Sequence, residues 1–440
     1  MKKLFITLTV VLVACFVASA QKDTTALAKY RRSSLYTVLI KHSSYPYAAE
    51  ILTAFKEMPI PDKFNDHNLW IREFESNASK MKQHGKTKDN LNIQDADQFI
   101  ADNGIAKALV AKWFNRDPST GGFDINLIQE RGFYDASQLD IASAKESARG
   151  TAALGDAGEE LIGKTFVMVN DITFVDKGET SAKVATGIAI AGRLAGALLG
   201  SSAISSAGNL AAAATNEIDG FTVNITSYLY RLIWDDVSAA TFYSSYWFPA
   251  NTTDPTRRAA FNNSDIFRVE YVGSTSTSAS NVSSKSFAKQ TKGQQMLKVC
   301  TRAIDKSIVQ LQRAYDEFKV NVPLYKIAED GSTVDVQIGL KEGVNEKSRY
   351  EVLMPVELAT GGMKYERVGM IQPVKGKIWD NRFGALEEAI ALKQSGEKSK
   401  DKDAANLEAA SLNATTFKVL TGANKIVPGC LVREVTIKRQ

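Results

Sequence analysis

The chain has 440 residues, of which 44% are hydrophobic and 23% are charged. This balance is typical of globular protein and excludes a disordered chain, and the length allows two or three domains with their own cores. The formal net charge is only +5, and Lys2 and Lys3 contribute two of those charges. So weak a positive charge on so long a chain argues against nucleic-acid binding.

The N-terminus has the three parts of a secretory signal peptide. Lys2 and Lys3 precede the apolar run LFITLTVVLVACFV, and Ala18-Ser19-Ala20 supplies small residues before Gln21. The apolar run is too short to span a bilayer. We therefore expect residues 1–20 to be a signal peptide that is removed on export. The mature chain would lie in the periplasm or cell envelope, with association with the outer membrane left open.

The cysteines leave alternatives open. Cys15 ends the sequence Leu-Val-Ala-Cys, which fits a lipobox, although the apolar run continues beyond it. Signal cleavage would leave only Cys300 and Cys430, which could form one disulfide in an oxidising compartment. Each also lies within an apolar pattern, so two separate buried thiols are the alternative.

Residues 21–150 are predicted to be mainly helical. Tyr45–Met58 has apolar residues at helical spacing and is stopped by Pro59. NLWIREFESNASKMKQ is a second amphipathic candidate. IQDADQFIADNGIAKALVAKWFN predicts one or two helices around Asn103-Gly104.

Residues 151–273 are predicted to form a mixed α/β domain. KTFVMVNDITFVD is rich in β-branched and aromatic residues, and FTVNITSYLYRLIWDD alternates, with Val223 and Ile225 on one face and Asn224 and Tyr228 on the other. The two strands are expected to pair. An Ala/Gly-rich helical insertion, residues 185–215, separates them.

The remainder is divided into three parts. Residues 274–288 are predicted to be a Ser-rich linker, and residues 289–320 a long amphipathic helix. Residues 321–440 are β-rich and suggest a small barrel, interrupted by a charged insertion at 393–411. Its strands are expected in VPLYKIA, TVDVQIG, SRYEVLMPVEL, KYERVGMI, KGKIWDN, TFKVLTG and CLVREVTIKR. The expected fold class is α+β.

Motifs for catalysis are absent from the sequence. Of the three histidines, His42, His67 and His84, none belongs to a spaced metal or triad motif, and His67 is expected in an exposed polar loop. No cysteine cluster has zinc spacing, and no glycine motif has the lysine or strand context of a nucleotide site. We therefore expect a non-enzymatic protein without cofactor or metal.

Two features suggest binding surfaces. On a helix, residues four apart share a face, so the glycines of 185–215 would form a groove for a closely packed partner helix; these are Gly192, Gly196, Gly200 and Gly208. The segment resembles glycine-zipper stretches of envelope and pore-forming proteins, but Arg193 and its serines disfavour simple membrane spanning. The aromatic residues Trp234, Tyr246 and Trp247 form either a sugar-binding surface or part of a core.

A pattern-level resemblance covers about 300 residues. KALVAKWF, FDINLIQERG, GEELIGKTFVMVNDI and FTVNITSYLYRLIWDD resemble the envelope-protein module shared by the N-terminal domain of TolB, curli-export lipoproteins and the flagellar ring protein FlgT. IGLKEGVNEKSRYEVLMP and YERVGMIQPV are similar to the small barrel ending the flagellar protein, with Gly339, Gly343 and Gly369 at matching turns.

The resemblance implies an envelope assembly or scaffold role. Self-association or envelope protein partners, with membrane contact, are expected. The alternatives are a carbohydrate-binding module that uses the aromatic residues, or a pore-like protein that uses the glycine-rich helix.

Overall fold

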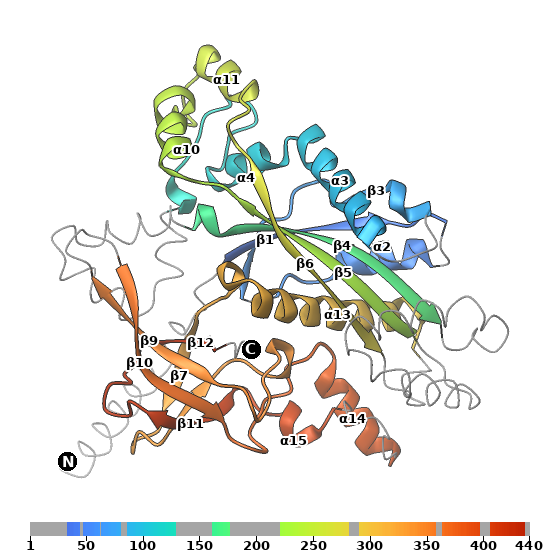
Figure 1. Cartoon of the computed structure of the whole chain (residues 1–440), viewed down its shortest axis with the longest axis vertical. Coiled ribbons are helices and arrows are strands. Elements are labelled where there is room, and N and C mark those ends of the chain that lie inside the picture. Colours follow the sequence, from blue (N-terminus) through green and yellow to red (C-terminus); the bar gives the residue numbers. More distant parts are fainter. Residues whose placement is uncertain are drawn as a thin grey trace, which may run out of the picture.

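The computed structural model describes residues 33–44, 47–61, 63–80, 86–128, 161–176, 221–280, 290–357, 363–396 and 405–435. Figure 1 shows a twisted sheet with helices on both faces and a small barrel beside it. The predicted α+β class with a C-terminal barrel is confirmed.

The sheet has the order β2-β1-β4-β5-β6, with β3 also paired to β1. Its strands are β1 (Ser33–Lys41), β2 (Phe64–Asp66), β3 (Glu73–Glu75), β4 (Thr165–Asp176), β5 (Phe221–Leu232) and β6 (Val269–Ser280). β1 is parallel to its three neighbours, whereas β4, β5 and β6 pair antiparallel. The sheet therefore joins segments from both predicted N-terminal domains.

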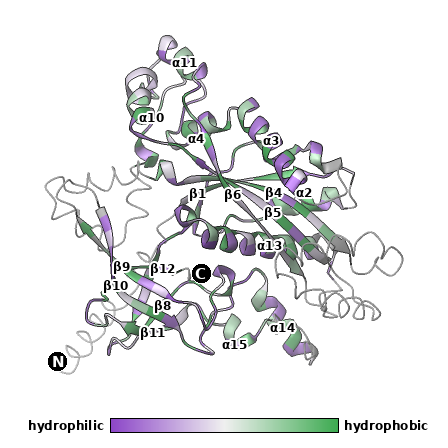
Figure 2. Ribbon diagram, viewed as in Figure 1, coloured by the Kyte–Doolittle hydropathy of each residue, from purple (hydrophilic) through white to green (hydrophobic). Residues whose placement is uncertain are grey.

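Helices cover both faces of the sheet (Figure 1). α3 (Lys86–Asp102) and α4 (Ile105–Trp113) pack on one face. α2 (Ala48–Glu57) and α13 (Lys292–Ala314) pack on the other. Figure 2 shows hydrophobic residues along the strands and hydrophilic residues on the side of α13 towards the barrel.

The prediction of a mainly helical region at 21–150 is wrong for β1, which is a central strand. Its residues are buried on both faces, so Leu35 and Leu39 enter one core while Tyr36 and Val38 enter the other. Such a strand has no polar alternation to reveal it. The proposed boundary at residue 150 is also wrong, because β1 pairs with β4.

The other helix predictions have mixed outcomes. α2 lies within the predicted Tyr45–Met58, and α3 and α4 meet at Asn103-Gly104, where Gly104 has a positive φ of 55°. The described part of NLWIREFESNASKMKQ, residues 68–80, however, contains β3 and a 3-10 turn, η1 (Asn77–Lys80), instead of a helix. The pairing of β3 with β1 overrides its amphipathic pattern.

The predicted pairing of β4 with β5 is confirmed. The register runs without interruption from Phe166↔Arg231 to Asp176↔Phe221. Segment 185–215, with Gly192, Gly196, Gly200 and Gly208, lies outside the described residues.

The prediction of a linker at 274–288 is wrong for Ser274–Ser280, which complete β6. Small hydroxyl residues there pair with β5, and the Thr226 and Ser276 hydroxyl oxygens lie 2.9 Å apart. Thr277 is buried. Pairing to a neighbouring strand satisfies a backbone whose side chains have little to bury.

A long helix within the predicted 289–320 is confirmed as α13, but it ends at Ala314, so the predicted C-terminal bound is too long. Thr291 and Gln294 form a capping box at its start. Met296, Val299, Ala303 and Leu311 point into the core beneath the sheet. A short 3-10 turn, η6 (Asp316–Phe318), then leads to the barrel.

The barrel closes in the order β10-β11-β8-β7-β12-β9. Its strands are β7 (Val322–Ile327), β8 (Thr333–Val336), β9 (Tyr350–Glu357), β10 (Met363–Pro373), β11 (Thr415–Thr421) and β12 (Leu431–Glu434). A short 3-10 turn, η7 (Leu340–Glu342), follows β8. KGKIWDN forms no strand, so that prediction is wrong.

Both ends of the predicted charged insertion at 393–411 are described, whereas residues 397–404 lie outside the described residues. The insertion begins in α14 (Ala385–Ser395) and ends in α15 (Leu407–Ala410), which pack through small alanines. Among the helices that the structure describes, none is long and apolar enough to cross a membrane.

One prediction follows from the close approach of β6 to α13 at Gly273. A Cβ atom there would overlap the hydroxyl and ring of Tyr315, whose hydroxyl accepts a hydrogen bond from the Ser274 amide at 2.9 Å. Gly273→Ala is expected to reduce the free energy of unfolding by about 1–3 kcal/mol through overpacking. Urea denaturation measures this, with Gly293→Ala as the control, because a Cβ at Gly293 meets nothing within 4 Å.

In a Tyr315→Leu background, Gly273→Ala should cost less, since the overlapping hydroxyl and ring are gone. Equal losses in both backgrounds would contradict the proposed overlap.

Candidate functional site

A network of charged side chains lies where β1 ends. His42 follows β1, Asp171 lies on β4, and Lys88 is in the first turn of α3. His42 Nε2 donates to Asp171 Oδ1 at 2.6 Å, and Lys88 Nζ lies 2.7 Å from Asp171 Oδ2. Their side chains are only 5%, 3% and 1% exposed, in the order His42, Asp171, Lys88. Protein atoms therefore enclose the ion pair.

Neutral groups extend this network across the sheet. Asn92 Nδ2 donates to Asp171 Oδ2 at 3.1 Å and to the Tyr228 hydroxyl at 3.0 Å. The Tyr228 hydroxyl donates to Asp89 Oδ1 at 2.9 Å. The network thus joins α3 to β4 and β5 through buried polar contacts.

The electrostatics keep Asp171 ionised. Burial opposes its charge, but the hydrogen bond from His42 and the charge of Lys88 outweigh burial and hold the pKa of Asp171 well below its usual range. Burial also raises the pKa of Tyr228, so its hydroxyl remains a donor. A carboxylate and a histidine in this arrangement resemble part of a proton relay, but their enclosure favours a role in holding the fold together.

The expected exposed loop at His67 is wrong. His67 is fully buried, its Nε2 lies 3.0 Å from the Leu109 carbonyl oxygen, and its ring lies 5.3 Å from that of Trp113. The polar sequence around it gave no indication that the segment after β2 packs against α4. In the described ranges, no three His, Cys, Asp or Glu side chains are grouped to hold a metal.

The two cysteines are free and buried, so the disulfide alternative is wrong. Cys300 lies in the core between α13 and the sheet, whereas Cys430 lies inside the barrel. Burial raises the pKa of the Cys300 thiol to about 12 and also raises that of Cys430. Both therefore serve as small apolar core residues.

A module projects from one end of the sheet. We define this tip module as residues 114–124 and 233–268. The second segment contains α10 (Asp236–Thr241), the π-helix η5 (Phe242–Tyr246) and α11 (Pro255–Asn262). The two segments are joined by a bridge between Phe123 and Pro249 and by clustered rings of Phe114, Phe123, Phe242, Phe261 and Phe267.

The predicted aromatic surface does not form an open platform. Tyr246 is buried, and Trp234 and Trp247 are half-buried. Trp234 stacks on Phe267 and Trp247 on Phe123, with ring centroids 6.4 and 6.0 Å apart. Because these rings pack against other rings of the protein, core packing explains them better than sugar stacking.

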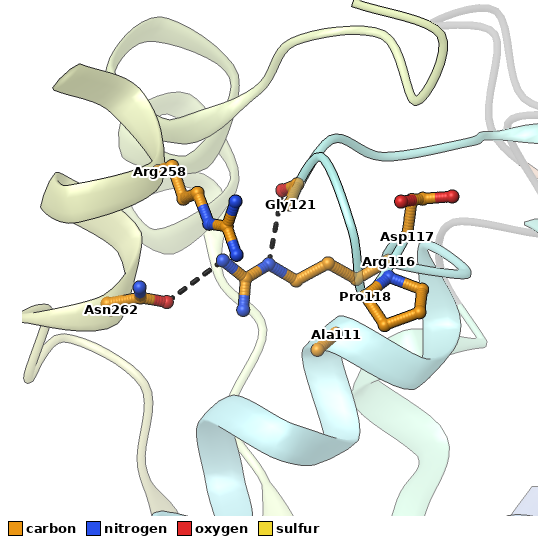
Figure 3. A pocket seen from close by; sticks show the side chains of 7 residues that line it. All are labelled: Ala111, Arg116, Asp117, Pro118, Gly121, Arg258 and Asn262. Atoms are coloured by element: carbon orange, nitrogen blue, oxygen red, sulfur yellow. Dashed lines mark hydrogen bonds between the residues drawn. The ribbon is translucent and has the colours of Figure 1, made fainter. Parts of the chain in front are cut away.

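The tip module contains an open pocket of about 240 Å³ (Figure 3). It is lined by Ala111, Arg116, Asp117, Pro118, Gly121, Arg258 and Asn262. Arg116 Nε donates to the Gly121 carbonyl at 3.1 Å and Nη2 to Asn262 Oδ1 at 2.9 Å. Arg258 Nη1 donates to the Ser119 carbonyl at 2.8 Å. Neutral oxygens therefore hold both arginines in place.

Positive charge dominates this pocket. Burial, and then the nearby charge of Arg258, lower the pKa of Arg116. Asp117 also lines the pocket, and hydrogen bonds from Ser119 and Thr120 lower its pKa to about 2. Figure 3 shows its carboxylate turned away from the two guanidinium groups.

Sequence reasoning missed both groups of residues. Asp171 places a charge in the middle of the predicted strand KTFVMVNDITFVD, and a charge in a buried strand implies a buried partner. That partner, Lys88, comes from a distant helix. Arg116 and Arg258 are 142 positions apart, and only the folding of α11 onto the loop after α4 brings them together.

Comparisons with known proteins add no assignment. No protein-family model matches the chain, and no curated protein matches it. The function is therefore inferred from the arrangement of the side chains in this structure.

The buried ion pair generates a prediction. Asp171→Asn would leave Lys88 charged and buried beside a neutral amide, and breaking such a pair costs about 3–5 kcal/mol. Chemical denaturation at pH 7 measures this loss. Lys364→Met is the matched control, because the exposed Lys364–Glu366 pair should contribute less than about 1 kcal/mol.

The pH dependence provides a second readout. Because the folded-state pKa of Asp171 is depressed, its stabilisation is complete above the pKa of an unfolded carboxyl, about 3.9. It is lost as the pH falls from there towards the folded-state pKa. Asp171→Asn should therefore flatten the acid limb of the stability curve, and an unchanged acid limb would contradict this account.

Proposed function

We propose that this protein is an exported, non-enzymatic scaffold of the cell envelope, which holds partners in a fixed relation. The observation that carries this proposal is the position of α13 between the sheet and the C-terminal region, to which the helix is attached at two points. One side of the helix is buried against the sheet, and the other bonds to the C-terminal region. A scaffold requires such a fixed connection between the parts that its partners contact.

The first attachment is at the C-terminal end of α13. Arg313 Nη2 donates to Glu434 Oε1 at 2.8 Å and to the Gly343 carbonyl at 2.9 Å. Hydrogen bonding to Glu434 raises the pKa of Arg313 despite burial. Two acceptors on separate barrel segments therefore fix one guanidinium.

The second attachment joins the middle of α13 to α14. Glu388 Oε2 lies 2.7 Å from Lys298 Nζ and 2.9 Å from Arg302 Nη2. Burial opposes ionisation of Glu388, but the two cations lower its pKa. Because these side chains are at most 11% exposed, the contact is far less screened than a surface salt bridge.

Enclosure of the acid–base groups supports a non-enzymatic role. His42, Asp171 and Lys88 have almost no contact with solvent. A general acid or base must reach hydrogen-bond distance of a substrate. These groups would need a rearrangement of the sheet to do so.

A cell-envelope experiment tests the scaffold role. Crosslinking in cells, followed by recovery from the envelope fraction, should yield a complex larger than the monomer, whose subunit begins at Gln21 or at lipidated Cys15. Arg313→Gln combined with Glu388→Gln should reduce the yield of this complex by loosening α13 from the barrel. Arg433→Gln is the control, because Arg433 pairs with Glu351 between the neighbouring barrel strands β12 and β9, away from α13.

Three results would oppose the proposal. The first is recovery of the protein as a soluble monomer only. The second is an unchanged yield of the complex from the double variant, although hydrogen exchange of the α13 amides shows that the helix is loosened. The third is turnover of a substrate that one acidic substitution abolishes.

We further propose that the glycine face at 185–215 mediates self-association. Gly196→Leu would block close approach of a partner helix by a whole side chain. The variant should keep its circular dichroism spectrum but elute as a smaller species in size exclusion with light scattering. Unfolding would assign the glycines to core packing, and an unchanged mass with unchanged membrane retention would reject the interface.

A further inference from the structure

We propose that the pocket between Arg116 and Arg258 binds a phosphoryl group, either as free phosphate or as the phosphomonoester end of a larger molecule. This inference does not rest on the scaffold role. It follows from two guanidinium groups in one concave site, both held by neutral acceptors.

The two arginines retain donors for a ligand. A guanidinium has five N–H donors, and the hydrogen bonds of Arg116 and Arg258 within the described residues use only some of them. Neither arginine has an acidic partner in those ranges, although surface arginines nearby do, such as Arg268 with Glu270. Because Asp117 is the one acidic residue among the lining residues of this pocket, the two arginines leave the pocket with a net positive charge.

Convergence of the two arginines depends on Gly121. This residue has a φ of +82°, and a Cβ atom there would lie 2.9 Å from Arg258 Cγ and Cδ and 3.1 Å from Arg116 Nη2. Any larger residue would push the two side chains apart. The loop thus allows two like charges to lie close together, and an anion between them would stabilise both charges.

A phosphoryl group matches this site better than a carboxylate. Its two negative charges balance two guanidinium groups, and its oxygens accept paired N–H bonds from arginine forks. The side wall from Ala111 and Pro118 offers no further charge. Asp117 would repel the ligand, but its carboxylate accepts hydrogen bonds from Ser119 and Thr120 and is turned away (Figure 3).

Calorimetry with inorganic phosphate, at fixed ionic strength, tests binding by the full protein. Vesicles of phosphatidylcholine, with and without phosphatidic acid, test a lipid phosphomonoester. Arg258→Gln should weaken binding about tenfold or more, because a charged hydrogen-bonding group is lost. Since Arg258 is exposed, this variant should keep its fold. Arg268→Gln removes the same charge from the tip module outside the pocket and should bind normally.

The outcomes show whether the pocket binds a phosphoryl group and whether that group belongs to a soluble molecule or to a lipid. Phosphate binding that Arg258→Gln weakens identifies a soluble ligand. Binding only to vesicles with phosphatidic acid, weakened in the same way, identifies a lipid headgroup. No binding of either probe by the native chain would overturn the proposal, as would equal effects of Arg258→Gln and Arg268→Gln. A normal affinity in Arg258→Gln would overturn it too.

Discussion

A charge in the middle of a sheet that is covered on both faces is the constraint on which the rest of the structure depends. Asp171 lies on β4 opposite Ile40 of β1, beneath α3. An isolated carboxylate there would be strongly unfavourable. Lys88 and Asn92 of α3 and His42 after β1 compensate for it. Their contacts fix α3 over the sheet and the end of β1 beside β4.

On the opposite face of the sheet, a buried polar side chain is also compensated by hydrogen bonds, but without charged groups. Asn170 donates to the Val38 carbonyl at 3.2 Å and accepts from the Ser227 hydroxyl at 2.7 Å. The Ser307 hydroxyl donates in turn to Ser227 at 2.7 Å. This buried chain aligns α13 with the sheet, while the outer side of α13 bonds to the barrel. The position of the barrel thus depends on polar contacts buried under the sheet.

Local patterns predicted the elements well where one periodicity dominated. The alternation of FTVNITSYLYRL identified β5 and its pairing with β4, and the apolar stripe of QQMLKVCTRAIDKSIVQLQRAYDEF identified α13. They failed where tertiary contacts decided the outcome. β1 carries no alternation because both its faces are buried, and Ser274–Ser280 join a strand through backbone pairing.

The candidate site was less predictable for the same reason. His67 lies in a polar stretch of the sequence, yet in the fold its ring packs against that of Trp113. Arg116 and Arg258 carry no motif, since only the fold of the tip module brings them together. Residue type and spacing describe neighbours along a helix or strand, whereas this pocket is built from two loops far apart in the sequence.

The long hairpin of β4 and β5 has a consequence for how the chain can change. Its register ends at Asp176 opposite Phe221, so the residues between them leave and re-enter the sheet at adjacent points. The entropy of closing such a loop grows only slowly with its length. The hairpin can therefore carry segments of very different length and composition with little effect on the stability of the sheet.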